Sequence, residues 1–97
     1  MSGVGDTPPL FDRLMHVQAG RCFYCECTLT TANPDDPTFA TFDHIKPRSA
    51  GGKNNRNRIL ACRCCNNRRG STALDDVTKA RAIQVSRSAY KLHRLAV

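Results

Sequence analysis

Apolar side chains in the N-terminal part of the chain recur at helical spacing, at Leu10, Phe11, Leu14 and Met15. Residues spaced in this way lie on one side of a helix. Thr7 precedes two prolines, which a first helical turn tolerates, and Gly20 follows the apolar stretch as a stop signal. The pattern predicts a helix that begins around Thr7, with Thr7 as its N-cap, and ends near Gly20.

An imperfect apolar stripe marks the last part of the chain. Its members are Leu74, Val77, Ala80, Val85, Ala89, Leu92 and Ala96, and basic residues occupy the other faces. The segment from Ser71 to Asp75 resembles a capping box with Asp in place of Glu. The pattern predicts a helix over about residues 73–95. We expect this helix to cover the core, and a dimerisation surface is the alternative.

The middle of the chain predicts a strand, a long loop, a second strand and a short helix. Residues 38–42 alternate large and small side chains, as a strand does, and deliver Asp43 and His44 at the strand's end. Residues 47–57 are too rich in Gly, Ser and Asn for regular structure, and residues 58–61 form the second strand. A helical turn is expected over residues 66–70 and a loop over residues 28–37.

Length and composition limit the size of the core. The chain has 97 residues, no Trp, four Phe and two Tyr. A single domain of this size usually needs disulfides, a metal or a partner subunit for stability. No secretory signal or membrane-spanning apolar stretch is evident, so we expect a cytoplasmic protein without a membrane partner. In that reducing compartment the six cysteines favour metal binding over disulfides.

The cysteines include two pairs with the same spacing, which are Cys22 with Cys25 and Cys62 with Cys65. This spacing suits a tight turn that directs both sulfurs at one tetrahedral ion, so the pairs predict a structural Zn²⁺ held by thiolates. Cys27 and Cys64 permit other registers, because each forms a C-x-C pair with a neighbour. We prefer the C-x-x-C register because both pairs then share one turn geometry.

The charge of the chain indicates the class of its partner. Fifteen Lys and Arg against eight Asp and Glu give a formal charge of +7, and residues 46–69 contain many of the cations and no acid. Such a segment attracts a polyanion through counterion release and steering. Nucleic acid is the expected partner, through contacts that hold phosphates without reading bases. The candidates are Lys46, Arg48, Lys53, Arg56, Arg58, Arg68 and Arg69.

The same segment carries short motifs in a fixed order. They are Asp43-His44-Ile45-Lys46-Pro47, Gly51-Gly52, Asn57 and Cys62-Arg63-Cys64-Cys65-Asn66, with Arg68 and Arg69 behind them. In this order they resemble the HNH endonuclease family, whose ββα-metal finger has the pattern D-H-x-x-P, G-G, N and C-x-x-C-N. The zinc-bound subgroup also carries an upstream C-x-x-C, here preceded by Gly20-Arg21. The resemblance covers roughly residues 20–71, with Asn66 where the family name has a histidine.

The resemblance implies an α+β fold: a small ββα-metal (His-Me) finger stapled by a zinc site of four cysteines and flanked by N- and C-terminal helices. Residues 1–97 would form one HNH nuclease domain. Its activity would be metal-dependent hydrolysis of DNA, by nicking or double-strand cleavage. One divalent ion would stabilise the phosphorane and the 3′ leaving oxygen, giving 5′-phosphate and 3′-hydroxyl ends. Small proteins of this family are common in bacteriophages, where some act with DNA-packaging or homing machinery, so a host cytoplasm is implied.

Individual residues suit this chemistry. His44 suits the general base, because an imidazole titrates near neutral pH. Asp43 would project to the other side of an extended backbone and bind Mg²⁺ or Mn²⁺, with Asn66 supplying a second oxygen. The resemblance gives Asn57 a supporting role in which it braces the loop and orients the base. Two other functions stay open: a zinc-dependent nucleic-acid-binding module that does not cut, and an HNH nuclease that cleaves RNA.

Overall fold

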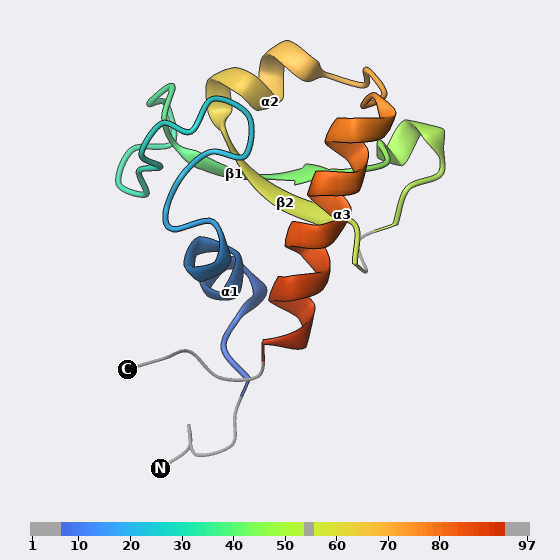
Figure 1. Cartoon of the computed structure of the whole chain (residues 1–97). Helices are drawn as coiled ribbons and strands as arrows, with labels where there is room; N and C mark the ends of the chain where they lie inside the picture. The colour runs from blue at the N-terminus through green and yellow to red at the C-terminus, as the bar shows by residue number, and fades with distance from the viewer. Residues whose placement is uncertain (1–6, 54–55, 93–97) are drawn as a thin grey trace.

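The computed structural model describes residues 7–53 and 56–92, which form a two-stranded antiparallel sheet with helices around it (Figure 1). The elements follow in the order α1 (Leu10–Val17), β1 (Ala40–His44), the 3₁₀ turn η1 (Arg48–Ala50), β2 (Arg58–Cys62), α2 (Arg63–Arg69) and α3 (Asp76–Lys91). The expected α+β class is confirmed, with a β-hairpin followed by a helix at its centre and further helices before and after it.

The two strands pair in a register that runs from Ala40 opposite Cys62 to His44 opposite Arg58. β1 therefore begins two residues later than the predicted strand over residues 38–42, and it contains Asp43 and His44. The later start has a local cause, because the backbone N–H and hydroxyl of Thr38 both donate to Asp36 Oδ1, at 3.3 and 3.0 Å. These bonds keep the chain in a turn before β1.

α2 follows β2 directly and is longer than the helical turn expected over residues 66–70. Cys62 caps it, since its Sγ accepts from the Cys65 backbone N–H at 3.4 Å, and a side-chain acceptor at this position stabilises a helix start. The helix ends at Gly70, whose φ of 54° is a left-handed value that suits glycine. α2 packs against both strands and so brings Asn66 and Arg69 beside β1.

α1 begins later than expected, and the predicted role of Thr7 as its cap is wrong. Pro9 occupies the N-cap position, and no side chain accepts a hydrogen bond there. Instead the backbone carbonyl of Pro9 accepts from the Arg13 N–H at 3.1 Å. After Val17 the chain turns through positive φ values of 54° at Ala19 and 71° at Gly20, and the Gly20 N–H donates back to the Met15 carbonyl at 2.8 Å.

α3 begins at Asp76, and the predicted capping box at Ser71 is wrong. The N-cap is Asp75, whose carboxylate accepts from the Thr78 backbone N–H at 2.7 Å. Ser71 itself lies in the turn after α2, closed by a bond from the Thr72 N–H to the Arg69 carbonyl at 3.0 Å. The helix ends at Lys91 with extended backbone at Leu92, and residues 93–95 of the predicted helix lie outside the described residues.

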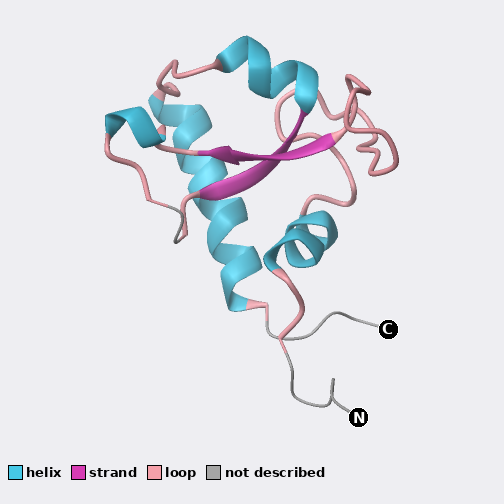
Figure 2. Ribbon diagram, turned by 180° about the vertical axis from the view of Figure 1, so that it is seen from behind, coloured by secondary structure: helices cyan, strands magenta, loops and turns pink. Residues whose placement is uncertain are grey.

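α3 covers one face of the hairpin, lying in front of the strands in Figure 1 and behind them in Figure 2. Its buried residues are Ala82, Ser86 and Ala89. Ala89 shares a core cluster with Leu14, Leu60, Cys22 and Cys62, so this helix packs on the core that holds cysteines of both pairs, as predicted. None of the helices in the described residues has the length and apolar character needed to cross a membrane.

Candidate metal centre and active site

The structure brings together the four cysteines of the preferred register, which are Cys22, Cys25, Cys62 and Cys65, with their sulfurs all within 4.8 Å of one another. The Sγ atoms of Cys25 and Cys62 are 3.8 Å apart. A tetrahedral zinc with Zn–S bonds of about 2.3 Å requires sulfurs about 3.8 Å apart. The donor set therefore fits a structural zinc ion.

Backbone N–H groups point at the sulfurs of this cluster. The Cys62 N–H donates to Cys22 Sγ at 3.3 Å and the Tyr24 N–H donates to the same atom at 3.4 Å. Bonds of this kind stabilise the thiolate form, which is the form that binds metal. Backbone N–H groups thus orient a sulfur acceptor in each of the two cysteine turns, Cys22 in the turn before the hairpin and Cys62 at the end of β2.

Three thiols of the cluster, Cys25, Cys62 and Cys65, have shifted pKa values. Hydrogen bonds from Cys27, first from its backbone and then from its side chain, lower the pKa of Cys25 to about 6. Burial raises the pKa of Cys62 and of Cys65. The Cys25 thiolate is therefore available as a ligand near neutral pH, whereas zinc must displace protons from Cys62 and Cys65.

The two remaining cysteines lie outside this set. Cys64 is exposed on α2, where Arg68 Nη2 approaches its Sγ at 3.5 Å. Cys27 is half-buried beside the cluster, and burial together with hydrogen bonds to Cys25 and Cys62 raises its pKa to about 12. The geometry favours the C-x-x-C register over the C-x-C alternatives.

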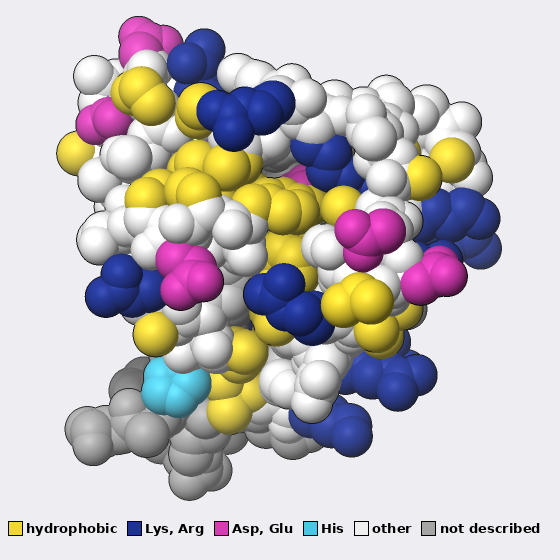
Figure 3. Space-filling model, turned by 45° about the horizontal axis from the view of Figure 1, so that its top comes forward, with side chains coloured by type: hydrophobic (Ala, Val, Ile, Leu, Met, Phe, Trp, Pro, Cys, Tyr) yellow, Lys and Arg dark blue, Asp and Glu magenta, His cyan; other side chains and the backbone are white. Residues whose placement is uncertain are grey.

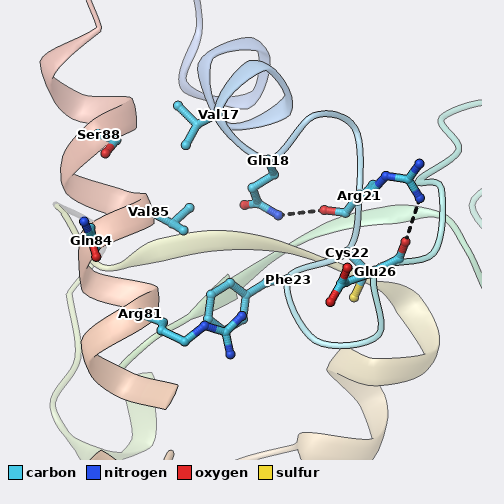
Figure 4. A pocket seen from close by; sticks show the side chains of 10 residues that line it. All are labelled: Val17, Gln18, Arg21, Cys22, Phe23, Glu26, Arg81, Gln84, Val85 and Ser88. Carbon is cyan, nitrogen blue, oxygen red and sulfur yellow. Dashed lines mark hydrogen bonds between the residues drawn. The ribbon is translucent and has the colours of Figure 1, made fainter. Parts of the chain in front are cut away.

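A cavity of about 330 Å³ lies between α1, the first cysteine turn and α3 (Figure 4). On one wall the Gln18 amide donates to the carbonyls of Arg21 and Leu60, both at 2.9 Å, and accepts from the Leu60 N–H at 2.8 Å. On the other wall the guanidinium of Arg81 lies 4.9 Å from the Phe23 ring centroid. These contacts tie the first cysteine turn to β2 and α3.

Asp43, His44 and Asn66 line a second, smaller recess of about 260 Å³ at the end of β1. Pro47 and Ser49 from the following loop and Gly70 and Ser71 from the end of α2 complete its wall. Successive strand residues project to opposite sides, yet at the strand's end both Asp43 and His44 reach this recess. The three residues that sequence analysis selected for chemistry are thus brought together.

Asp43 is held on both of its carboxylate oxygens. Its side chain is only 5% exposed, Oδ1 accepts from Arg69 Nη1 at 2.9 Å, and Oδ2 accepts from the Tyr24 hydroxyl at 2.5 Å. Burial, and then the hydrogen bond to Asp43, raises the pKa of Tyr24 well above its ordinary value. The carboxylate therefore has one charged and one neutral donor fixed in place.

Arg69 does not serve as the phosphate contact that the sequence suggested. Its side chain is 8% exposed, and besides Asp43 it donates to the backbone carbonyls of His44, Ile45 and Thr72. Arg58 is also partly engaged within the fold, because its guanidinium lies 4.6 Å from the Phe42 ring centroid. A lone basic residue in a sequence does not reveal whether its side chain faces solvent or the core.

Asn66 is oriented through its amide nitrogen, which donates to Thr41 Oγ1 at 2.9 Å and to the Phe42 carbonyl at 3.0 Å. Within the described residues its Oδ1 accepts no hydrogen bond, so this oxygen remains available as a ligand. A carboxylate oxygen from Asp43 and an amide oxygen from Asn66 are the donors that Mg²⁺ and Mn²⁺ prefer. The donor set at the recess therefore fits a hard divalent ion.

Asn57 braces the loop between the strands and does not line the recess. Its Oδ1 accepts from the Lys46 N–H at 2.9 Å, while its Nδ2 donates to the carbonyls of Lys46 at 2.9 Å and Lys53 at 2.7 Å. A Cβ at Gly52 would lie 1.8 Å from the Lys46 carbonyl oxygen, so only glycine fits this closely packed loop. The Gly-Gly and Asn motifs thus shape the segment that follows His44.

The other predicted phosphate contacts are distributed around this loop and α2. Lys46, Lys53, Arg56 and Arg68 are exposed, and the side chain of Arg48 lies outside what the structure describes. Tyr24 and Gln18 support the site although neither was predicted from the sequence. Tyr24 sits inside the first C-x-x-C turn, but nothing in that spacing points toward Asp43.

Comparison with protein families gives a match to the HNH endonuclease family over residues 22–72, just over half of the chain. The matched span contains both cysteine pairs, the hairpin, the recess and α2. The chain therefore belongs to the HNH endonuclease family, as its motifs indicated. Members of this family are generally nucleases, so membership implies a nucleic-acid substrate. No curated protein and no solved structure matches the chain.

Proposed function

We propose that this protein is a metal-dependent HNH endonuclease that hydrolyses phosphodiester bonds in DNA. The observation that carries the proposal is the convergence of Asp43, His44 and Asn66 on one recess. A module that only binds nucleic acid has no need for an imidazole, a carboxylate and an amide oxygen at a common point. Family membership supports the same class of reaction.

In this proposal His44 is the general base. It accepts a proton from a water molecule, whose oxygen attacks the phosphorus atom as the bond to the 3′ oxygen breaks. The leaving oxygen takes up a proton, and the products carry 5′-phosphate and 3′-hydroxyl ends. Bonds from Arg69 to the His44 and Ile45 carbonyls fix the backbone on which the imidazole is mounted.

Asp43 and Asn66 would hold one divalent ion, Mg²⁺ or Mn²⁺, whose charge offsets the charge that develops on the phosphate and on the leaving oxygen. Tyr24 and Arg69 hold the Asp43 carboxylate in place before any ion arrives. Thr41 and Phe42 do the same for the Asn66 amide. Such preorganisation lowers the entropy lost when the site is assembled.

Basic residues of the β1–β2 loop and of α2 would hold the DNA backbone. We assign this role to Lys46, Arg48, Lys53, Arg56 and Arg68, with a smaller contribution from the half-buried Arg58. Asn57 positions the loop that carries Lys46 and Lys53. Because these contacts are to phosphates, affinity for DNA should fall steeply as salt is added.

One observation favours a second function, a zinc-dependent module that binds nucleic acid without cutting it. Both carboxylate oxygens of Asp43 already have donors, and the positive charge of Arg69 opposes a cation at the same group. The nuclease requires Asp43 to bind an ion through its remaining lone pairs or to exchange a donor for that ion. The two functions therefore differ in whether a divalent ion gives cleavage.

Cleavage of supercoiled plasmid by zinc-loaded protein separates these functions. We expect nicked or linear product with Mg²⁺ or Mn²⁺, none with EDTA, and none with His44→Ala. His16→Ala is the matched control, because His16 is exposed on α1 and away from the recess, and it should cleave normally. DNA binding without cleavage under every condition would replace the nuclease with the binding module. Digestion of RNA in parallel tests the RNA-cleaving alternative.

We propose further that the protein acts in the cytoplasm of a bacteriophage's host, together with DNA-packaging or other DNA-processing proteins. The resemblance to small phage HNH proteins supports this placement. Co-purification of the tagged protein with a packaging component from infected cells is the expected result, and association with host proteins alone would argue against it.

A further inference from the structure

A cavity of about 540 Å³ lies on the other side of the β1–β2 loop, between that loop and α3. Its cations come from both elements, and they are Lys46, Arg56, Lys79, Arg87 and Lys91. All five side chains are exposed, while the half-buried Ile83 and Tyr90 lie at its inner wall. Among the described residues, no acidic side chain lines the cavity.

The cations of α3 repeat with the period of the helix. The three cations Lys79, Arg87 and Lys91 form, together with Ile83, a series spaced four residues apart. They therefore project from one face of α3. Some of the Lys and Arg side chains lie on the right of Figure 3, the side on which Figure 1 shows the β1–β2 loop, with acidic side chains near them and further cations over the rest of this face. In the described part of the chain the one ion pair joins Asp43 to Arg69, so these cations have no carboxylate partner there.

Such an arrangement raises the electrostatic energy of the folded protein unless an anion offsets it. The row from Lys79 to Lys91 spans about 18 Å along the helix, at a rise of about 1.5 Å per residue. One phosphate would need cations that converge on a point. A row of this length instead matches several successive phosphates of a nucleic-acid strand, whose charges recur about every 3.4 Å along the duplex axis.

The cavity and the recess share one short segment of chain. His44 and Pro47 line the recess, whereas the residues between them, Ile45 and Lys46, line the cavity. Asn57 fixes this segment by bonding both backbone groups of Lys46. A strand held at the recess can therefore continue over the loop to the cavity without leaving the protein surface.

We propose that this cavity is a second nucleic-acid site, in which Lys79, Arg87 and Lys91 of α3 bind backbone phosphates that flank the phosphate in the recess. The proposal rests on the proposed function for the identity of the strand. It adds α3, which lies beyond the matched family span, to the surface that holds the substrate. The contacts position the strand and leave the chemistry at His44 unchanged.

The test compares two pairs of substitutions that each remove two positive charges from exposed positions. The cavity pair is Lys79→Gln with Arg87→Gln, and the control pair is Arg21→Gln with Arg63→Gln, which lie outside both the cavity and the recess. Binding of a labelled DNA duplex to zinc-loaded protein is measured by fluorescence anisotropy over a range of salt, without added divalent ion so that no cleavage occurs. Thermal melting and zinc content check folding.

For the cavity pair we expect the slope of log affinity against log salt to become shallower by about 2, since each lost phosphate contact changes it by about 1. The control pair should leave the slope unchanged. Equal changes in both pairs would overturn the proposal, because charge alone would then explain the effect. If the cavity pair unfolds, Lys79→Gln and Arg87→Gln are measured singly, with a change of about 1 expected for each.

Two further arms distinguish this proposal from others. In the first arm, ATP and inorganic phosphate are titrated into the wild type and the same variants. The proposal would be overturned by a small-anion site, which would appear as tight binding of either ligand that the cavity pair abolishes while the salt slope for DNA stays unchanged.

In the second arm, plasmid cleavage is measured, and the cavity pair should raise KM and leave kcat unchanged. Absence of cleavage in every variant would overturn the nuclease, whereas the salt slopes would still decide the second site.

Discussion

The guanidinium of Arg69, the last residue of α2, forms a buried ion pair with Asp43 near the end of β1, with 2.9 Å between Nη1 and Oδ1. The same group also holds the carbonyls of His44 and Ile45. α2 begins at the second cysteine pair, and so the helix connects the cysteine cluster to the strand end that carries the proposed base. The described contacts thus form a continuous path from the cysteine cluster to the recess.

The first prediction concerns this ion pair. Arg69→Gln leaves the buried Asp43 carboxylate without its charged partner, and removing one member of a buried pair typically costs about 3–5 kcal/mol. We expect a marked loss of unfolding free energy in chemical denaturation and loss of cleavage. Arg68→Gln is the matched control at an exposed position. It should keep wild-type stability but make the salt dependence of DNA binding shallower by about 1. Wild-type stability in Arg69→Gln would contradict the assignment.

The second prediction concerns the cysteines. Cys25→Ser and Cys62→Ser each remove a sulfur from the cluster, and because structural zinc contributes directly to folding, both variants should lose bound zinc and their cooperative melting transition. Cys64→Ser removes an exposed thiol outside the cluster and should keep both. Zinc content by atomic absorption and melting by circular dichroism report the result. Loss of zinc in Cys64→Ser with retention in Cys65→Ser would require the C-x-C register.

Motifs whose residues lie close together in the sequence, at a spacing that fixes their local conformation, were predictable from the sequence. The two C-x-x-C turns, the hairpin, and the placement of His44 and Asn66 all follow from spacing and from the family pattern. Element boundaries were less accurate where a side chain captures a backbone group. Asp36 delays β1, Cys62 starts α2 early, and Asp75 caps α3.

Contacts between distant segments could not be predicted. Tyr24 reaches Asp43 and Gln18 reaches Leu60 across long stretches of sequence, and neither belongs to a spaced motif. The basic residues illustrate the same limit. Arg68 and Arg69 are adjacent and chemically identical, yet one is exposed and the other lies against the backbone of β1. Net charge predicted the class of partner, but only the packing of the folded chain shows whether a given arginine faces solvent or is engaged within the fold.

The third prediction concerns acid stability. The backbone N–H of Thr78, first, lowers the pKa of the Asp75 carboxyl below its ordinary value. A group whose pKa is depressed on folding stabilises the protein above its unfolded pKa, and that stability is lost as pH falls through the folded value. We expect part of the stability lost below about pH 4 to come from this cap.

Asp75→Asn tests this contribution, because asparagine also caps helices and does not titrate. The variant should match the wild type near neutral pH and show a weaker decline of unfolding free energy in acid. Identical acid profiles for wild type and Asp75→Asn would show that the cap does not contribute.

The last prediction concerns the loop that follows His44. In Gly52→Ala the new methyl group would meet the Lys46 carbonyl oxygen at 1.8 Å and the Asn57 amide nitrogen at 2.9 Å, so the backbone of residues 46–52 must move. The bonds from Asn57 to Lys46 would then break, and His44 would lose its fixed position. We expect cleavage to fall at least tenfold, by a loss of about 1.4 kcal/mol or more in transition-state stabilisation, while zinc content stays at the wild-type level.

Gly51→Ala provides the comparison within the same loop. Gly51 has a φ of 89°, which strains any other residue, but a Cβ there would meet nothing closer than Lys46 Nζ at 4.0 Å. Gly51→Ala should lower the free energy of unfolding by about 1–2 kcal/mol, through backbone strain alone. The folded protein should cleave DNA at the wild-type rate. Cleavage is measured at a temperature well below both melting transitions. If Gly52→Ala cleaves as well as Gly51→Ala, the close packing of Gly52 against Lys46 does not position His44, and the bracing role of Asn57 fails with it.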